Sequence, residues 1–175
     1  MRIVMIAASS LDGKISQWDK PGVVGWNSDE DKQYFADLIS HASLSIMGSG
    51  TYEVIRGTIA NSSEKLRVIL TSTPEKYHSE RVEGQLEFWN ATPTAAIEKL
   101  AQLGYTEALL LGGSEVHGSF LAAGLVNEIW LTLEPKIFGT GKSLAGVSRL
   151  EVNLRLLEQA QLNGNGTLLL KYEVL

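Results

Sequence analysis

The chain has 175 residues, of which 44% are apolar and 20% charged, with 15 Lys and Arg against 20 Asp and Glu and no Cys. This length and mixture predict one globular domain spanning residues 1–175 and exclude a disordered chain. Without Cys there is no disulfide, thiolate metal site or cysteine nucleophile, and the net charge of −5 argues against nucleic-acid binding.

The apolar segment near the start, residues 3–8, is six residues long and is followed closely by Asp12 and Lys14. A secretion signal needs about 7–15 apolar residues and a membrane span needs ~20. The pattern therefore predicts a cytoplasmic protein, with no membrane partner, whose first segment is a buried strand over residues 2–8.

The next part of the chain predicts a long loop, a helix and a second strand. Residues 9–27 are rich in Gly and Pro, which is typical of a functional loop. Ser28 suits a helix N-cap, because three acidic residues follow it in the first turn. Helical spacing then places four apolar side chains on one face: Phe35, Leu38, Ile39 and Ala42. Residues 44–47 form the strand, and residues 48–51 turn into a short helix through Arg56.

The remaining elements follow the same alternation of apolar runs and helical patterns. Thr92 and Pro93 predict a helix start, and Gly104 ends that helix. A further helix is expected from Ser114, as its N-cap, to Gly124. The expected strands cover residues 66–70, 86–89, 108–111 and 129–133, and residues 152–174 predict an antiparallel hairpin turning at 163–166.

Repeated strand–helix units predict an α/β fold with three layers. Its central sheet is mixed but mostly parallel, with helices on both faces and the antiparallel hairpin at the C-terminal edge. Ligands of such sheets bind beyond the carboxyl ends of the strands. The candidate loops are residues 9–27, 48–51, 71–74, 112–114 and 134–143.

Two glycine-rich segments each join a buried strand to a helix start. They are Gly48-Ser49-Gly50-Thr51 and Gly112-Gly113-Ser114. Glycine lets a ligand approach the backbone, and free N–H groups at a helix start bind anions. Each segment alone is also compatible with a tight turn, but together they predict a ligand with two phosphate groups.

Gly139-Thr140-Gly141-Lys142-Ser143 resembles part of a P-loop, but Lys136 stands where that motif needs its first glycine. The segment also follows the sixth predicted strand rather than the first. We therefore expect a flexible loop over the site, in which Lys136 and Lys142 supply local positive charge.

Asp31 is the candidate proton donor, because a carboxyl partly removed from water beside Trp26 has a raised pKa. The alternative is a solvated residue that favours the helix dipole. Asp12 is either a turn residue or a substrate ligand. The three His residues are far apart without metal-ligand spacing, so no metal site is predicted, and His117 is expected to pack near the ligand.

Taken in order, these segments resemble the dihydrofolate-reductase-like superfamily. They are most similar to the reductase domain of the riboflavin-biosynthesis deaminase/reductase. The resemblance spans residues 1–145 and is carried by five blocks: residues 10–15, residues 26–35, Met47-Gly48-Ser49-Gly50-Thr51-Tyr52-Glu53, Leu111-Gly112-Gly113-Ser114-Glu115-Val116, and residues 131–141.

The resemblance implies a reductase that depends on NADPH and forms a homodimer. Gly50 and Thr51 would meet the pyrophosphate, and Thr71 and Ser72 the adenosine. The other side of the cofactor would be lined by Gly112, Gly113, Ser114, Glu115 and Val116.

The substrate would lie between the loop of residues 9–27 and the first helix. Asp31 or Asp12 would bind it or assist proton delivery. Trp26 is expected to contact it, and Lys14, Lys136 or Lys142 would bind a phosphate group.

The chain departs from the family pattern in three ways. Ser49 stands where dihydrofolate reductases usually carry a basic residue, so NADH stays open as an alternative to NADPH. Lys65 and Arg67 occupy the region where folate enzymes place a glutamate-binding arginine. The zinc deaminase signature is absent, since it requires Cys.

The leading hypothesis is hydride transfer to a small heterocyclic or sugar-derived substrate, such as a phosphoribosylamino-pyrimidine. The alternatives are reduction of dihydrofolate or another pteridine, and a non-catalytic nucleotide-binding protein.

Overall fold

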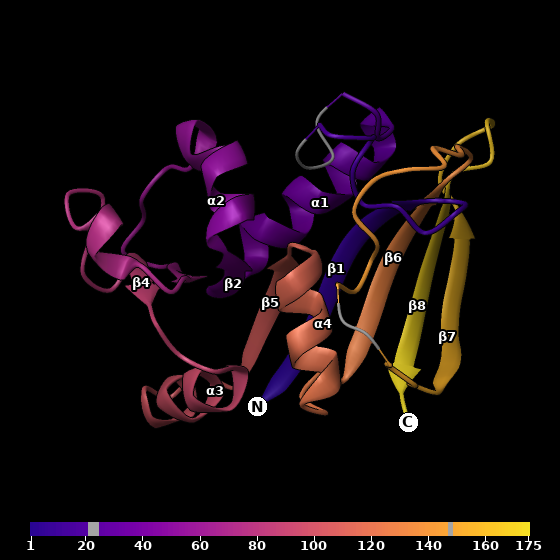
Figure 1. The fold of residues 1–175 in the computed structure, drawn as a ribbon. Coiled ribbons are helices and arrows are strands. Elements are labelled where there is room, and N and C mark those ends of the chain that lie inside the picture. Colours follow the sequence, from indigo (N-terminus) through magenta and orange to yellow (C-terminus); the bar gives the residue numbers. More distant parts are fainter. Residues whose placement is uncertain (21–24, 147–148) are drawn as a thin grey trace.

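The computed structural model describes residues 1–20, 25–146 and 149–175. Eight strands among these residues form one sheet in the order β4-β3-β2-β5-β1-β6-β8-β7 (Figure 1). The strands are β1 Arg2–Ser10, β2 Leu44–Gly48, β3 Leu66–Leu70, β4 Leu86–Trp89, β5 Glu107–Gly112, β6 Glu128–Glu134, β7 Leu154–Gln161 and β8 Leu168–Val174. The helices are α1 Asp29–His41, α2 Ser49–Ile55, α3 Pro93–Gln102 and α4 Ser114–Ala122, with 3-10 turns η1 Arg56–Thr58 and η2 Pro74–Tyr77.

The sheet is parallel from β4 to β6, and β8 and β7 add an antiparallel hairpin at one edge. Helices connect the parallel strands, because a crossover must return the chain to the same end of the sheet. The predicted fold class is confirmed.

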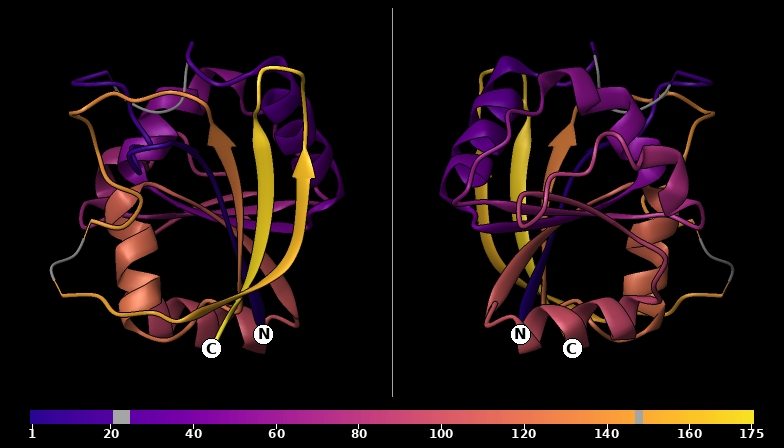
Figure 2. Two further views of the ribbon diagram at one scale, coloured as in Figure 1. Left: turned by 90° about the vertical axis from the view of Figure 1, so that its right-hand side faces the viewer. Right: turned by 90° about the vertical axis from the view of Figure 1, so that its left-hand side faces the viewer.

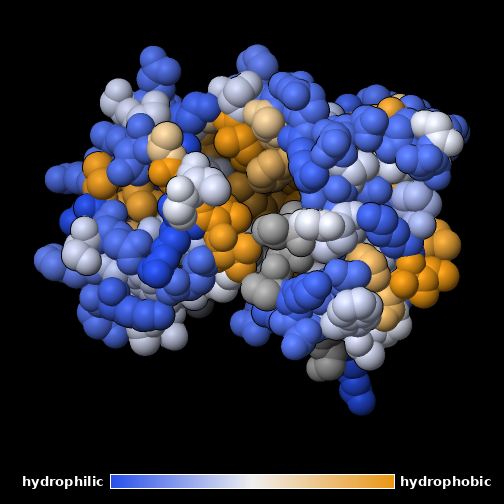
Figure 3. Space-filling model, turned by 90° about the horizontal axis from the view of Figure 1, so that it is seen from above, coloured by the Kyte–Doolittle hydropathy of each residue, from blue (hydrophilic) through white to orange (hydrophobic). Residues whose placement is uncertain are grey.

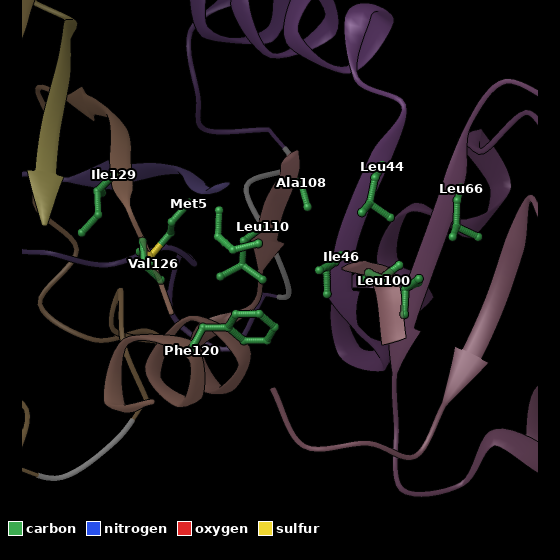
Figure 4. Close-up of a cluster of buried hydrophobic side chains, with 12 residues drawn as sticks. Met5, Leu44, Ile46, Leu66, Leu100, Ala108, Leu110, Phe120, Val126 and Ile129 are labelled. Carbon is green, nitrogen blue, oxygen red and sulfur yellow. The ribbon is translucent and has the colours of Figure 1, made fainter. Parts of the chain in front are cut away.

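Helices cover both faces of the sheet (Figure 2). Leu38 and Ile39 of α1 pack with Val4 and Ile6 of β1 on one face. On the other face, α3 and α4 contribute Leu100 and Phe120 to the largest core cluster. Figure 4 shows Phe120 pointing toward Leu110 of β5. Truncating a fully buried Phe to Ala costs about 3–5 kcal/mol, so this contact strongly stabilises the α4 layer.

Two local predictions are wrong. Gly113, not Ser114, is the N-cap of α4, and Ser114 Oγ instead donates a hydrogen bond to the carbonyl of Ser143 at 2.6 Å. Phe35 does not join the core face of α1, since its side chain is 37% exposed and lines a cavity. The helical spacing is otherwise correct, because Leu38, Ile39 and Ala42 pack on the cluster of Val4, Ile6 and Leu109.

The four helices begin in two different ways. Ser28 caps α1 by accepting from the Asp31 N–H at 3.2 Å, and Thr92 caps α3 by accepting from Ala95 N–H at 3.3 Å. In contrast, α2 and α4 begin after Gly48 and Gly113 with no side-chain cap. Both uncapped starts lie at the carboxyl end of the parallel strands.

Two loops at the same end of the sheet run side by side. Ile15 N–H donates to Lys142 O at 2.9 Å, and Leu144 N–H donates to Gly13 O at 3.1 Å. These bonds join residues 10–18 to residues 136–144 as one layer.

Among the described residues, no helix has the length and apolar character needed to cross a membrane.

Candidate functional site

A cavity of about 720 Å³ opens at the carboxyl ends of β1, β2, β3 and β5. This volume is within the range of small-molecule binding sites. Seen from above, it is a recess with apolar side chains inside a mostly hydrophilic rim (Figure 3). Its wall comes from β1, α1, the start of α2, the start of α4 and the two joined loops.

Asp31 is the acidic group at the α1 end of this cavity. Its side chain is only 6% exposed, and its carboxyl accepts hydrogen bonds from Asn27 Nδ2 at 2.8 Å and from Thr132. Burial raises the pKa of Asp31 above its ordinary value, and the charge of nearby Glu134 acts in the same direction. A buried carboxyl with a raised pKa can hold a proton for transfer to a ligand.

Glu134, to which the sequence patterns assign no role, fixes the start of α1. The side chain is 2% exposed, and its two oxygens accept from the Ser28 N–H at 2.7 Å and from Thr167 Oγ1 at 2.9 Å. Asn163 Nδ2 also donates to Glu30 at 2.9 Å. The hairpin turn, the end of β6 and the first turn of α1 therefore hold Asp31 in place together.

Tyr34 and Phe35 of α1 form an aromatic wall beside Asp31. Phe35 presents an exposed ring to the cavity, as an apolar surface for a planar ligand. The Tyr34 hydroxyl is buried with no hydrogen-bond partner among the described residues, and desolvation raises its pKa to about 12. The hydroxyl therefore stays protonated at neutral pH and is available as a donor.

Glycine brings the start of α4 close to its neighbours. A Cβ on Gly112 would lie 2.7 Å from the ring of His117, and one on Gly113 would lie 3.1 Å from Thr51 Oγ1. Gly112 also has φ +89, a conformation that favours glycine. The backbone N–H groups in the first turn of α4 have no partner within the helix and face the cavity wall that Gly113 and Val116 line.

His117 lies one turn into α4 and is 1% exposed. Its Nδ1 donates to the carbonyl of Leu144 at 3.2 Å, while Nε2 is buried without a partner in the described part of the chain. Burial lowers the pKa of His117 to about 4, so the ring is neutral at pH 7. The neutral ring thus packs between the backbone of Gly112 and the carbonyl of Leu144 and ties the start of α4 to the loop of residues 136–144.

Six of the nine residues predicted to bind a cofactor lie together in the cavity wall: Gly50, Thr51, Gly113, Ser114, Glu115 and Val116. Gly112 lies behind the wall against His117. Thr71 and Ser72 follow Leu70, which is in the wall, but do not line it themselves.

The residues predicted to bind substrate occupy different positions. Lys136 Nζ donates to the carbonyl of Trp26, and the buried Trp26 ring packs edge-to-face on Phe138 at 5.1 Å. Neither Trp26, Lys136 nor Lys14 lines the cavity, whereas Lys32 and Lys142 do. The interpretation of residues 139–143 as a lysine-bearing loop over the site agrees with the position of Lys142.

Asp12 joins the two loops rather than lining the cavity. Its carboxylate accepts from Ser10 Oγ at 2.6 Å, from Phe138 N–H at 3.1 Å and from Gly139 N–H at 2.8 Å. These bonds, the one from Ser10 first, lower the pKa of Asp12 to about 2. A carboxylate held in this way positions the loop and is a poor proton donor.

The site is thus a cavity across the carboxyl edge of an α/β sheet, with a buried acid at one end and two helices that start at glycines beside it. The chain belongs to the RibD C-terminal domain family, whose model matches residues 2–169.

Relatives and solved structures agree with this assignment. The uncharacterized proteins YwjB and YyaP of Bacillus subtilis (strain 168) are 26% and 25% identical over 160 and 164 residues, 89% of this chain and 88% and 86% of theirs. A putative riboflavin biosynthesis protein from Shewanella sp. PV-4 has the same fold, with a TM-score of 0.79 and 20% identity over 100% of this chain and 99% of that one. A pyrimidine reductase-like protein from Corynebacterium diphtheriae has a TM-score of 0.77 at 16% identity over 99% and 92%.

A larger protein contains the same fold as one part. The chain matches 56% of a diaminohydroxyphosphoribosylaminopyrimidine deaminase/5-amino-6-(5-phosphoribosylamino)uracil reductase from Thermotoga maritima, with a TM-score of 0.75 and 18% identity. At this identity the likeness shows the fold alone.

Proposed function

We propose that this chain is a reductase that acts on a small heterocyclic or sugar-derived substrate with a reduced nicotinamide dinucleotide. It is most like the 5-amino-6-(5-phosphoribosylamino)uracil reductase of riboflavin biosynthesis. The observation that carries the proposal is a single cavity that joins the buried acid Asp31 to the uncapped start of α4. Membership of a reductase-like family supports it.

The residues present fit such a cofactor, for which the resemblance implies NADPH. A Cβ at Gly113 would crowd Thr51, so glycine keeps open the approach to the free N–H groups of α4. Gly113, Ser114 and Thr51 would hold the phosphates, and the nicotinamide when bound supplies a hydride.

Reduction by a hydride also needs a proton, and Asp31 is placed to hold one. The hydrogen bonds from Asn27 and Thr132 fix its carboxyl, and burial favours the protonated form. Ile6, Ala8 and Phe35 surround the adjacent space, so a planar ring would be held there with little water. Orientation against a fixed donor is the contribution expected of the protein.

A phosphate on the substrate would meet Lys142 and Lys32 in the cavity wall. Lys32 is partly committed to Asp29, at 2.7 Å, whereas Lys142 has no ion pair among the described residues. Lys142 is therefore the main candidate for the phosphate, in place of Lys14 and Lys136.

Replacing Asp31 by Asn tests the proposal. We expect turnover to fall ~100-fold, because the proton source is lost, while dinucleotide affinity changes by less than ~2-fold. Loss of reduced nicotinamide would be followed with the pyrimidine riboside and with dihydrofolate in parallel. Asp37→Asn, at an exposed position of the same helix, is the matched control.

Three outcomes would change the proposal. Reduction of dihydrofolate alone would replace the substrate class, and an unchanged rate in Asp31→Asn would remove Asp31 from the mechanism. Binding of neither NADH nor NADPH would overturn the reductase function.

The proposal includes a homodimer in the cytoplasm. Leu154, Leu156 and Leu157 of the outer strand β7 are exposed, and large exposed apolar side chains gathered on one strand are typical of association surfaces. Light scattering of the purified protein would show twice the chain mass, and Leu156→Lys would return it to a single chain.

A further inference from the structure

The cavity has a second end, formed by α2 and the carboxyl end of β3. Ser49, Val54 and Ile55 of α2 and Leu70 of β3 line it. In the sheet, β3 is three strands from β1, the order being β3-β2-β5-β1. At ~4.8 Å per strand the two ends are about 14 Å apart.

This separation decides which part of a dinucleotide lies where. The hydride donor must be near Asp31 if Asp31 supplies the proton, as the proposed function requires. The adenosine then lies at the β3 end, where Val54, Ile55 and Leu70 offer an apolar surface for the adenine. Any group on the 2′ position of its ribose meets the charges of this end.

The cations of η1 and η2, Arg56 and Lys76, do not line the cavity and are paired with carboxylates of the chain. Arg56 lies 3.3 Å from Glu53 and 3.7 Å from Glu80, and Lys76 lies 3.0 Å from Glu53. The same two carboxylates accept hydrogen bonds from Tyr77, at 2.9 Å, and Tyr52, at 2.5 Å. The tyrosine hydroxyls hold both carboxylates in place, so each cation keeps an acidic partner within the chain.

The other cations of residues 49–90 are also engaged or distant. Lys65 donates to the carbonyls of Ile39 and Ser40, both at 2.7 Å, and Arg81 pairs with Glu87 at 2.7 Å. Arg67 is the second residue of β3, about 10 Å along the strand from Leu70, and does not line the cavity. The segment has six acidic and five basic residues, a net charge of −1.

A neutral hydroxyl takes the place of a free cation. Ser49 lines the cavity at the start of α2, and no Lys or Arg of residues 49–90 lines it. The Ser49 hydroxyl matches a hydroxyl of a ribose, whereas a phosphate dianion in this part of the wall would be left without a charged partner. We propose that this end accepts a ribose with a free 2′-hydroxyl, so that the chain binds NADH in preference to NADPH. The proposal rests on the proposed function.

Titration of the whole chain with four ligands tests this selectivity by calorimetry. The ligands are NADH, NADPH, ADP-ribose and 2′-phospho-ADP-ribose, and the last two cannot transfer hydride. We expect each ligand without the 2′-phosphate to bind at least ~10-fold more tightly than its phosphorylated partner. NADPH binding as tightly as NADH would overturn the selectivity alone, whereas binding of none of the four would overturn the proposed function.

Two substitutions should shift the preference by independent routes. Ser49→Arg adds a cation to the wall and should raise NADPH affinity ~10-fold, with NADH affinity within about 2-fold of the wild type. Glu53→Gln keeps an acceptor for Tyr77 but releases Lys76 and leaves Arg56 with Glu80 alone, and should raise NADPH affinity ~3-fold. Gln102→Arg, exposed at the end of α3, is the control for net charge.

Circular dichroism identifies variants that fold. If Ser49→Arg does not fold, Glu53→Gln decides the question. A folded Ser49→Arg or Glu53→Gln that leaves the ratio of the two affinities unchanged, or a Gln102→Arg that shifts it equally, would overturn the assignment of the 2′ position to this end.

Discussion

The starts of α1 and α3 differ from those of α2 and α4 in how their backbone N–H groups are satisfied. Ser28 and Thr92 cap the first pair, while Gly48 and Gly113 leave the second pair without a side-chain cap. A side-chain cap contributes about 1 kcal/mol to stability. The helices α2 and α4 lack this contribution, although a single Ser, Thr, Asp or Asn at the N-cap could supply it. Both uncapped starts line the cavity, and so does the capped start of α1 through Asp31 and Lys32. The α1 start therefore presents side chains to the cavity, whereas the starts of α2 and α4 leave backbone N–H groups there without a side-chain cap.

The neutral His117 lies one turn into α4, after a first turn with one carboxyl group, Glu115, whereas the first turn of α1 contains three carboxyl groups. The pKa of His117 is about 4 in the folded chain, against an ordinary value of 6.5. Between pH 6.5 and 4 the unfolded chain binds a proton that the folded chain does not, so stability falls as the pH is lowered. We expect the protonation of His117 to lower the free energy of unfolding by about 3 kcal/mol between pH 6.5 and pH 4.

Urea unfolding at a series of pH values would measure this loss. His117→Gln should be less stable at pH 7 but lack this part of the pH dependence. A ring resonance of the wild-type protein that titrates near pH 6.5 would contradict the prediction.

A side-chain cap on α4, like the one on α1, should satisfy the free N–H groups that distinguish the start of α4 from that of α1. In Gly113→Asp the carboxylate would accept the free N–H groups and repel the phosphates of a ligand. We expect the Kd for the dinucleotide to rise ~100-fold, with little loss in the free energy of unfolding.

The matched variant is Gly113→Ala, which adds the same Cβ near Thr51 without a charge. Its Kd should rise less than ~10-fold. An equal loss in both variants would attribute the effect to crowding rather than to the occupied N–H groups.

Removing the side-chain caps of α1 and α3 should have the smallest effect of these changes. Ser28→Ala and Thr92→Ala should each lower the free energy of unfolding by about 1 kcal/mol. Only Ser28→Ala should also reduce turnover, because Ser28 accepts from the Asp31 N–H. Denaturation and steady-state rates measured on both variants check this, and a rate loss in Thr92→Ala would contradict it.

Sequence patterns predicted most of the fold because the signals are local. The strands β3 and β4 have the expected bounds, residues 66–70 and 86–89, since each is a short apolar run between turn residues. The caps Ser28 and Thr92 were equally visible, because a cap acts within three residues. The prediction that Ser114 caps α4 was wrong because a distant contact decides its position: its hydroxyl donates to the carbonyl of Ser143, 29 residues away.

The site was harder to predict from the sequence, because contacts between residues far apart in the chain assemble it. Strand–glycine–helix segments located the α4 wall, and helix position located Asp31. Glu134 carries no local signal, since its partners Ser28 and Thr167 are 106 and 33 residues away. Lys136 was expected at the ligand but donates to the carbonyl of Trp26, 110 residues away.

The bonds of Glu134 also set an order of events during synthesis. Ser28 is made long before Glu134, and Thr167 follows Glu134 by 33 residues. At 5–20 residues per second the ribosome needs roughly 2–7 s to cover that last stretch. Until then one oxygen of a carboxylate that must be buried has no hydroxyl to accept from, and α1 lacks its brace from the hairpin. The growing chain can form its parallel strands early, but it completes the surroundings of Asp31 only when its last hairpin has been made.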